Sequence, residues 1–183
     1  MSQEQRYLFF VKDNNFPESK YTPSKLPLGV KYNYYKPRLW SIAPKGLKWK
    51  YPFPLYWVLA YLSFFKNDYY TILTIYHDRC LIHYTCLIPP FFQTPFMNDQ
   101  DLQVGPIWTS KQFRRKGLAK FGISSMTSQY SQNIRKFWYI VRKENKPSIK
   151  LIDKLGFEYY GEGVKKNGLF GISALGKFIV QDK

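Results

Sequence analysis

Hydrophobic and polar positions follow two periods along the chain, and their order predicts a mixed α/β protein. Short runs rich in β-branched and aromatic residues, such as residues 80–88 and 137–142, are typical of strands. Residues 117–130 favour a helix, and a shorter apolar-faced helix ends at Gly156. The remaining predicted elements are strands at residues 7–11, 69–77, 158–165 and 169–180, a strand starting near residue 101, and a helix at residues 55–65.

Turn residues separate several of these elements. Residues 77–79 predict the turn of an antiparallel hairpin, and Asn167-Gly168 is a good pair for a tight turn between the last two strands. Residues 13–54 are dense in Pro, Lys and Tyr with little periodicity, which predicts long ordered loops. Their aromatic side chains argue for packing and include Tyr32, Tyr34, Tyr35, Trp40 and Trp49.

Residues 114–119 form a short basic loop at the start of the predicted helix. The first N–H groups of a helix carry partial positive charge, and small residues let the backbone approach a ligand closely. With three neighbouring cations, this pattern predicts an anion with linked phosphates as the ligand. The loop consists of Arg114, Arg115, Lys116, Gly117, Leu118 and Ala119.

Two sequence motifs lie within a predicted unit of strand, helix, strand, helix and strand. The first is an arginine, two residues, a glycine, one residue and an alanine; the second is an asparagine, two residues, a serine and a short helix closing in Gly-Phe. In this order the chain resembles the GNAT superfamily of acyl-CoA-dependent N-acetyltransferases. The resemblance is carried by Arg114, Gly117, Ala119, Asn145, Ser148, Gly156 and Phe157.

The resemblance covers roughly residues 69–178 and implies an α/β fold with a mixed, mostly antiparallel central sheet flanked by helices. Length and apolar content predict one domain over residues 1–183. Within it we expect residues 69–183 to be the acyl-CoA-binding core, and residues 1–68, which the resemblance leaves largely unexplained, to be an aromatic, proline-rich elaboration on the acceptor side. The loop at residues 114–119 would hold the pyrophosphate of acetyl-CoA, and no metal is implied. Backbone groups of Ile107, Trp108 and Thr109 would pair with the pantetheine amides, and Asn145 and Ser148 would border the same arm.

The chain departs from the family at the residue expected to protonate the leaving thiolate. Many members place a tyrosine one residue after the leucine of the short helix, where this chain has Ile152. Either Tyr139, Tyr159 or Tyr160 supplies the proton, or the thiolate leaves with help from solvent.

Two residues are candidates for the base that deprotonates the acceptor amine. His83 is the only histidine within a predicted strand, and its usual pKa near 6.5 suits the task. A strand period of two would place it on the face opposite Ile82. Asp101 is the alternative, because Gln103, on the same face, occupies the position of a glutamate in some relatives and an amide cannot act as a base.

The acceptor is predicted from a second, less specific resemblance. From Leu81 to Arg114 the chain is similar to GNAT-type proteins associated with bacterial surface-polysaccharide synthesis, which implies the amine of a nucleotide-linked deoxyamino sugar as the acceptor. Aromatic side chains suit a sugar and a base, and positive charge suits a second diphosphate. The alternatives are a protein, peptide or other small-amine N-acetyltransferase, and a CoA-binding module that has lost catalysis.

The formal charge of +16 favours polyanionic ligands and disfavours cationic acceptors such as lysine-rich tails. No zinc spacing or RNA-binding signature accompanies it, so nucleic-acid binding is not expected. The two cysteines lie too far apart along one strand to form a disulfide, which predicts free thiols in a reducing compartment. The N-terminal residues are polar, unlike a secretory signal, which predicts a cytoplasmic protein. The apolar residues 51–65 are too few to cross a membrane, but their aromatic side chains keep peripheral membrane contact open.

Overall fold

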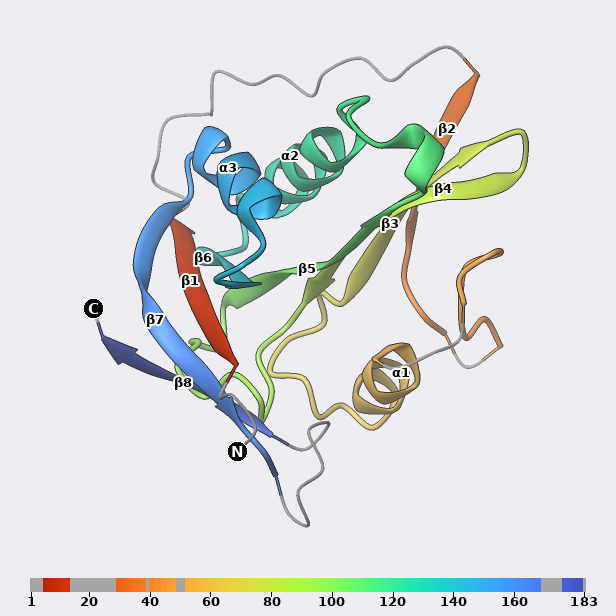
Figure 1. The fold of residues 1–183 in the computed structure, drawn as a ribbon. Helices are drawn as coiled ribbons and strands as arrows, with labels where there is room; N and C mark the ends of the chain where they lie inside the picture. The colour runs from red at the N-terminus through yellow and green to blue at the C-terminus, as the bar shows by residue number, and fades with distance from the viewer. Residues whose placement is uncertain (1–4, 14–28, 39, 49–51, 169–175, 183) are drawn as a thin grey trace.

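The computed structural model describes residues 5–13, 29–38, 40–48, 52–168 and 176–182. These residues form one eight-stranded sheet, in the order β2-β3-β4-β5-β6-β1-β7-β8, with helices on both faces (Figure 1). The elements are β1 (Arg6–Asp13), β2 (Val30–Tyr35), α1 (Phe53–Tyr61), β3 (Thr71–His77), β4 (Cys80–Ile88), β5 (Asp101–Thr109), the 3-10 helix η1 (Lys111–Phe113), α2 (Leu118–Tyr130), β6 (Lys136–Arg142), α3 (Lys146–Lys154), β7 (Glu158–Lys166) and β8 (Lys177–Asp182).

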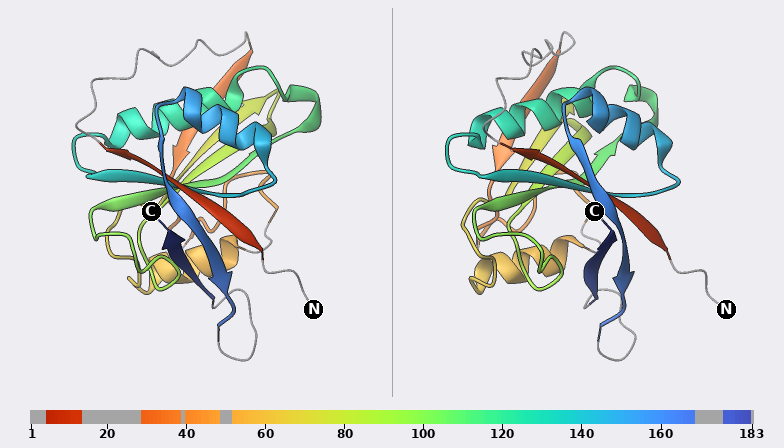
Figure 2. Two further views of the ribbon diagram at one scale, coloured as in Figure 1. Left: turned by 60° about the vertical axis from the view of Figure 1, so that its left-hand side comes forward. Right: turned by 90° about the vertical axis from the view of Figure 1, so that its left-hand side faces the viewer.

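All neighbouring strands are antiparallel except β5 and β6, which are parallel. A parallel pair needs a crossover, and the chain makes it through η1 and α2. Helices α2 and α3 cover one face of the sheet and α1 covers the other (Figures 1 and 2). The predicted mixed, mostly antiparallel sheet flanked by helices is therefore confirmed.

Each face of the sheet has its own hydrophobic core. Beneath α2 and α3 the fully buried side chains include Leu73, Leu102 and Met126. Beneath α1 a second cluster joins Phe53 and Tyr56 to strand residues such as Ile72, Cys86 and Ile88. Strand β1 lies between β6 and β7, so the N-terminal part of the chain contributes a central strand to the sheet.

The prediction that residues 13–54 form only loops was partly wrong. Residues 30–35 form β2, which pairs with β3 as an edge strand. Its tyrosines are only half buried, so the chain shows no strong alternation of buried and polar residues there. Trp40 does not pack, because 93% of its surface is exposed, and Trp49 lies outside the described residues.

Two predicted boundaries also moved. Helix α1 has a proline in its first turn and ends at Tyr61, before the positive φ of 56° at Ser63. Lys166 of β7 pairs with Lys177 of β8, so Asn167-Gly168 does not join these strands as a two-residue turn. Residues 169–175, predicted to be part of the last strand, lie outside the described residues.

The β3–β4 hairpin forms as predicted, with positive φ at Asp78 and Arg79 in its turn. Cys80 and Cys86 are free, as predicted. No helix in the described part of the chain is long and apolar enough to cross a membrane.

Candidate functional site

Strands β5 and β6 separate after a short stretch of pairing, and this separation opens the candidate site. They pair only from Asp101 to Gln103 on the β5 side. Beyond that point β5 carries a register shift against β4, and Gly105 has a φ of +125°, a conformation that favours glycine. The bend directs the end of β5 away from β6, so the facing backbone groups are left for a ligand.

A cavity of about 980 Å³ occupies this opening. Its walls are the separated ends of β5 and β6, the start of α2 and the start of α3. Tyr7 of β1, Tyr56 of α1 and the preceding Pro52 also line it. Because α1 lies on one face of the sheet and α2 and α3 on the other, the cavity is lined from both faces.

The start of α2 forms one end of the cavity. Gly117 precedes the helix with a φ of 79°, and no described side chain caps the helix at this residue. The first helical hydrogen bond runs from Phe121 N to Gly117 O, so the amides of Leu118 and Ala119 project from the end of the helix. Arg114 lines the same region and donates from Nε to the carbonyl of Thr109 at 3.3 Å. This end of the cavity therefore suits a phosphate group.

The start of α3 forms the adjacent wall. The Asn145 side-chain oxygen accepts a hydrogen bond from the Ser148 amide at 3.3 Å and caps the helix. Tyr139 of β6 lines the cavity beside them. Burial raises the pKa of the Tyr139 phenol, while its hydrogen bond with Ser148 acts in the opposite direction. The phenol is therefore protonated at neutral pH and can donate a proton.

The lining residues give the cavity a positive charge. They include Arg114, Arg115, Lys120 and Arg142. No aspartate, glutamate or histidine of the described chain lines the cavity, and no group of three metal-ligating side chains occurs among the described residues. The cavity thus favours an anionic ligand and offers it backbone groups, arginines and a phenol.

The sequence profile of the FR47-like protein family matches residues 95–165, which contain most of these walls. No curated protein matches the sequence. Among solved structures the chain is similar to a tandem GNAT protein from the clavulanic acid biosynthesis pathway, at 14% identity and a TM-score of 0.61 over 87% of this chain and 51% of that chain. The chain has the GNAT fold.

Two further structures share this fold. A Drosophila protein has 15% identity and a TM-score of 0.61 over 87% of this chain and 49% of that chain. A GCN5-related N-acetyltransferase from Sphaerobacter thermophilus has 11% identity and a TM-score of 0.58 over 87% of this chain and 50% of that chain. The chain spans about half the length of each of these three proteins.

Within this GNAT fold, the structure brings together nearly all residues predicted to bind acetyl-CoA. Every one of them lines the cavity except Lys116, whose ammonium group instead lies 4.9 Å from the centre of the Phe113 ring. Ile152 is fully buried in the core beneath α2 and α3, while its neighbour Leu151 lines the cavity. Of the three tyrosines considered as proton donors, Tyr139 lines the cavity, whereas Tyr159 packs on Phe10 and Tyr160 on Trp138.

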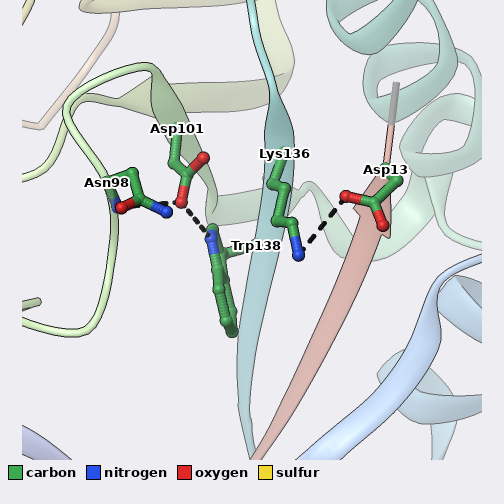
Figure 3. Close-up of polar contacts among 5 residues, drawn as sticks. All are labelled: Asp13, Asn98, Asp101, Lys136 and Trp138. Atoms are coloured by element: carbon green, nitrogen blue, oxygen red, sulfur yellow. Dashed lines mark hydrogen bonds and ion pairs between the residues drawn. The ribbon is translucent and has the colours of Figure 1, made fainter. Parts of the chain in front are cut away.

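Asp101, a predicted base, lies away from the cavity. Its Oδ2 atom accepts hydrogen bonds from the indole N–H of Trp138 at 2.8 Å and from the Asn98 amide at 2.9 Å (Figure 3). The residue is fully buried. Next to it, Lys136 of β6 pairs with Asp13 of β1 at 3.5 Å. Asp101 holds the paired end of β5 against β6 and cannot reach an amine in the cavity.

His83, the other predicted base, is also fully buried and does not line the cavity. Its Nδ1 lies 2.8 Å from Thr109 Oγ1, and its Nε2 lies 2.8 Å from Thr85 Oγ1. Burial lowers the pKa of His83 to about 4. The imidazole is therefore neutral at pH 7, has both nitrogens occupied, and reaches the cavity only through the Thr109 hydroxyl.

The predicted facing of His83 was wrong as well. A register shift between Ile75 and Tyr76 inserts an extra residue into β4, so Ile82 joins the core beneath α2. His83 also faces α2, since a Cβ on Gly122 of this helix would lie 2.7 Å from its Nε2. A bulge breaks the alternation of faces on which the prediction depended.

Among the lining residues that the sequence analysis missed are Tyr7, Pro52, Tyr56, Lys120 and Arg142. Lys120 and Arg142 had a local signal, because each lies within a few residues of a motif. Tyr7, Pro52 and Tyr56 had none, because they come from segments far away along the chain.

His83 is expected to make the stability of the protein depend on pH. Its pKa is lowered from 6.5 to about 4 on folding, so the unfolded chain binds the proton more tightly. The contribution of His83 to the free energy of unfolding is complete above pH 6.5 and falls as the pH drops toward 4. Between pH 7.5 and pH 5 the free energy of unfolding should fall by about 2 kcal/mol through this group.

Urea unfolding of the wild type and His83→Gln at these two pH values tests this. Glutamine does not titrate and keeps hydrogen-bonding capacity toward the two threonines. The variant should therefore lose less stability on acidification than the wild type. An equal loss in both proteins would contradict the burial of a neutral imidazole.

Proposed function

We propose that the protein is an acetyl-CoA-dependent N-acetyltransferase. The observation that carries this proposal is the cavity between β5 and β6, with the start of α2 and Arg114 at one end. Helix amides and arginines complement a diphosphate, and the separated edge of β5 complements the amides of a pantetheine arm. The volume of about 980 Å³ lies at the upper end of the usual range for ligand cavities.

Acetyl-CoA, when bound, supplies an acetyl thioester, and the chain positions an amine beside it. Backbone groups from Ile107 to Thr109 orient the thioester, so that the reaction becomes effectively unimolecular. The Tyr139 phenol donates a proton to the leaving sulfur. Because no described carboxylate or imidazole lines the cavity, water accepts the proton of the amine.

Tyr139→Phe is expected to lower kcat roughly tenfold, below the usual effect of about 100-fold or more for a general acid, because a thiolate leaves even without full protonation. The KM for acetyl-CoA should change little, because Phe keeps the packing of the ring. Steady-state kinetics that follow release of the free thiol measure both constants. Tyr160→Phe is the matched control, since Tyr160 packs on Trp138 and does not line the cavity. Equal kcat values for the two variants would remove Tyr139 from the mechanism.

For the acceptor we propose the amine of a nucleotide-linked deoxyamino sugar. Tyr7 and Tyr56 line the cavity, and their aromatic rings suit a sugar ring. Arg142, which pairs with Tyr7 across β1 and β6, offers a guanidinium to a second diphosphate. A net charge of +16 disfavours cationic acceptors such as polyamines and lysine-rich tails.

Thermal unfolding with acetyl-CoA and with a panel of UDP-, TDP- and GDP-linked amino sugars tests the proposal. Acetyl-CoA should raise the unfolding temperature, and one sugar nucleotide should raise it further and release free thiol. Thiol release only with peptides or small amines would replace the proposed acceptor. If acetyl-CoA raised the unfolding temperature but no amine were acetylated, the chain would be a CoA-binding module without catalysis. No shift with acetyl-CoA would overturn the proposal.

A further inference from the structure

Helix α1 lacks the polar outer face that a surface helix normally has. Its sequence, FPLYWVLAY, contains no charged residue. Phe53, Tyr56 and Leu59 are buried against the sheet, as expected for an inner face. The outer side of the helix is also apolar, although it is exposed: 40% of the surface of Val58 and 56% of the surface of Tyr61 are accessible to solvent.

The exposed apolar surface continues past the end of the helix. Leu62 is 52% exposed and Phe64 is 62% exposed. The Trp57 and Tyr61 rings stack with an interplanar angle of 1° and a centroid separation of 5.5 Å. We call Val58, Tyr61, Leu62 and Phe64 the α1 patch. A patch of large, exposed apolar side chains on one short segment is typical of a surface that binds a protein partner or a membrane.

Along the chain, the charged residues that flank the α1 patch are basic up to Asp68. Between Glu18 and Asp68 the sequence holds nine basic residues and no acidic residue. Lys45, Lys48 and Lys66 are exposed on the two sides of α1 along the chain. The segment that carries Lys45 and Lys48 lies beside the helix, because Leu47 packs against the cluster beneath α1.

We propose that the α1 patch docks on an anionic lipid surface. Aromatic and aliphatic side chains next to lysines are the composition of segments that lie at the membrane interface. The lysines would pair with lipid phosphates while the α1 patch enters the headgroup region. Nucleic acid fits the charge and can stack on Tyr61 and Phe64, but the aliphatic Val58 and Leu62 offer it neither a stacking surface nor a hydrogen bond. A lipid surface takes up all four side chains.

Docking would place the cavity close to the membrane. Pro52 and Tyr56, at the start of α1, line the cavity, whereas the α1 patch begins on the outer side of the same helix. The start of α2 lies on the opposite face of the sheet (Figure 2). The acceptor side would therefore face the lipid surface, and the phosphate-binding end would stay open to solution.

Co-sedimentation with lipid vesicles tests this inference without any assay of catalysis. One set of vesicles is phosphatidylcholine alone, and in the other phosphatidylglycerol replaces a third of it. The wild type should sediment with the anionic vesicles, and added salt should weaken this binding. Leu62→Asp/Phe64→Asp should weaken it at least about tenfold, because two apolar side chains are replaced by anions. Circular dichroism confirms that the double variant is folded.

Tyr159→Asp is the matched control, because Tyr159 is 55% exposed but lies on β7. It should bind the anionic vesicles like the wild type. Equal binding by the wild type and the double variant, or equal binding to neutral and anionic vesicles, would overturn the proposal. The proposal would also be overturned if the protein did not bind vesicles and Leu62 and Phe64 were instead required for RNA binding or for self-association.

Discussion

Replacing Ala119 with glutamate is expected to weaken acetyl-CoA binding at least about 100-fold. Ala119 lies in the first turn of α2 and lines the cavity where the helix amides and Arg114 would meet the pyrophosphate. A carboxylate there would occupy the same donors and repel the phosphates. The same carboxylate stabilises the start of a helix, so the fold should not be weakened. Isothermal titration calorimetry and thermal unfolding separate the two effects.

Gln112→Glu provides the matched control for the added charge. Gln112 is exposed in η1, a few residues before the loop, and does not line the cavity. Its substitution should change the affinity by less than about threefold, since an exposed charge is screened by solvent and salt. If Ala119→Glu bound acetyl-CoA as tightly as Gln112→Glu, the pyrophosphate would have to bind elsewhere.

Replacing Gly122 with alanine is expected to lower the free energy of unfolding by about 3 kcal/mol. A Cβ at this position would lie 2.4 Å from Thr85 Oγ1 and 2.7 Å from His83 Nε2. Neither atom is the end of a flexible side chain, because the two are hydrogen-bonded to each other and buried. Helix α2 would have to move away from β4, and the buried pair would lose contacts.

Thermal unfolding of Gly122→Ala should show a decrease of roughly 10 °C. Acetyl-CoA binding should weaken too, because the start of the displaced helix forms the end of the cavity proposed to bind the pyrophosphate. Ser128→Ala, at an exposed position of the same helix, should leave the stability within about 0.5 kcal/mol of the wild type. A loss for Gly122→Ala no larger than that of Ser128→Ala would show that α2 adjusts without cost.

The sequence predicted best those parts of the protein that are continuous along the chain. The loop at residues 114–119 and the helix after it form one local unit, whose chemistry depends on helix geometry and on neighbouring cations. The Asn145 cap is local in the same way. The start of α2 and the start of α3 were therefore placed correctly before any tertiary contact was known.

The predictions that failed depended on residues far apart in the sequence. Edge strand β2 pairs with β3 across some forty residues of chain, and its half-exposed tyrosines hide the period of two. Trp40 was expected to pack and is exposed. An aromatic residue in a loop carries no information on whether another segment covers it.

The same distinction applies to the catalytic candidates. Residue type marked His83 and Asp101 as bases, but a bulge in β4 and the packing of α2 and Trp138 decide that both are buried outside the cavity. The sequence by itself determined the order of the elements and the two motifs that we propose bind CoA, because hydrophobic period, caps and turns act over a few residues. Only the tertiary structure decided that Tyr139 faces the cavity, since that follows from how β5, β6 and α3 pack together.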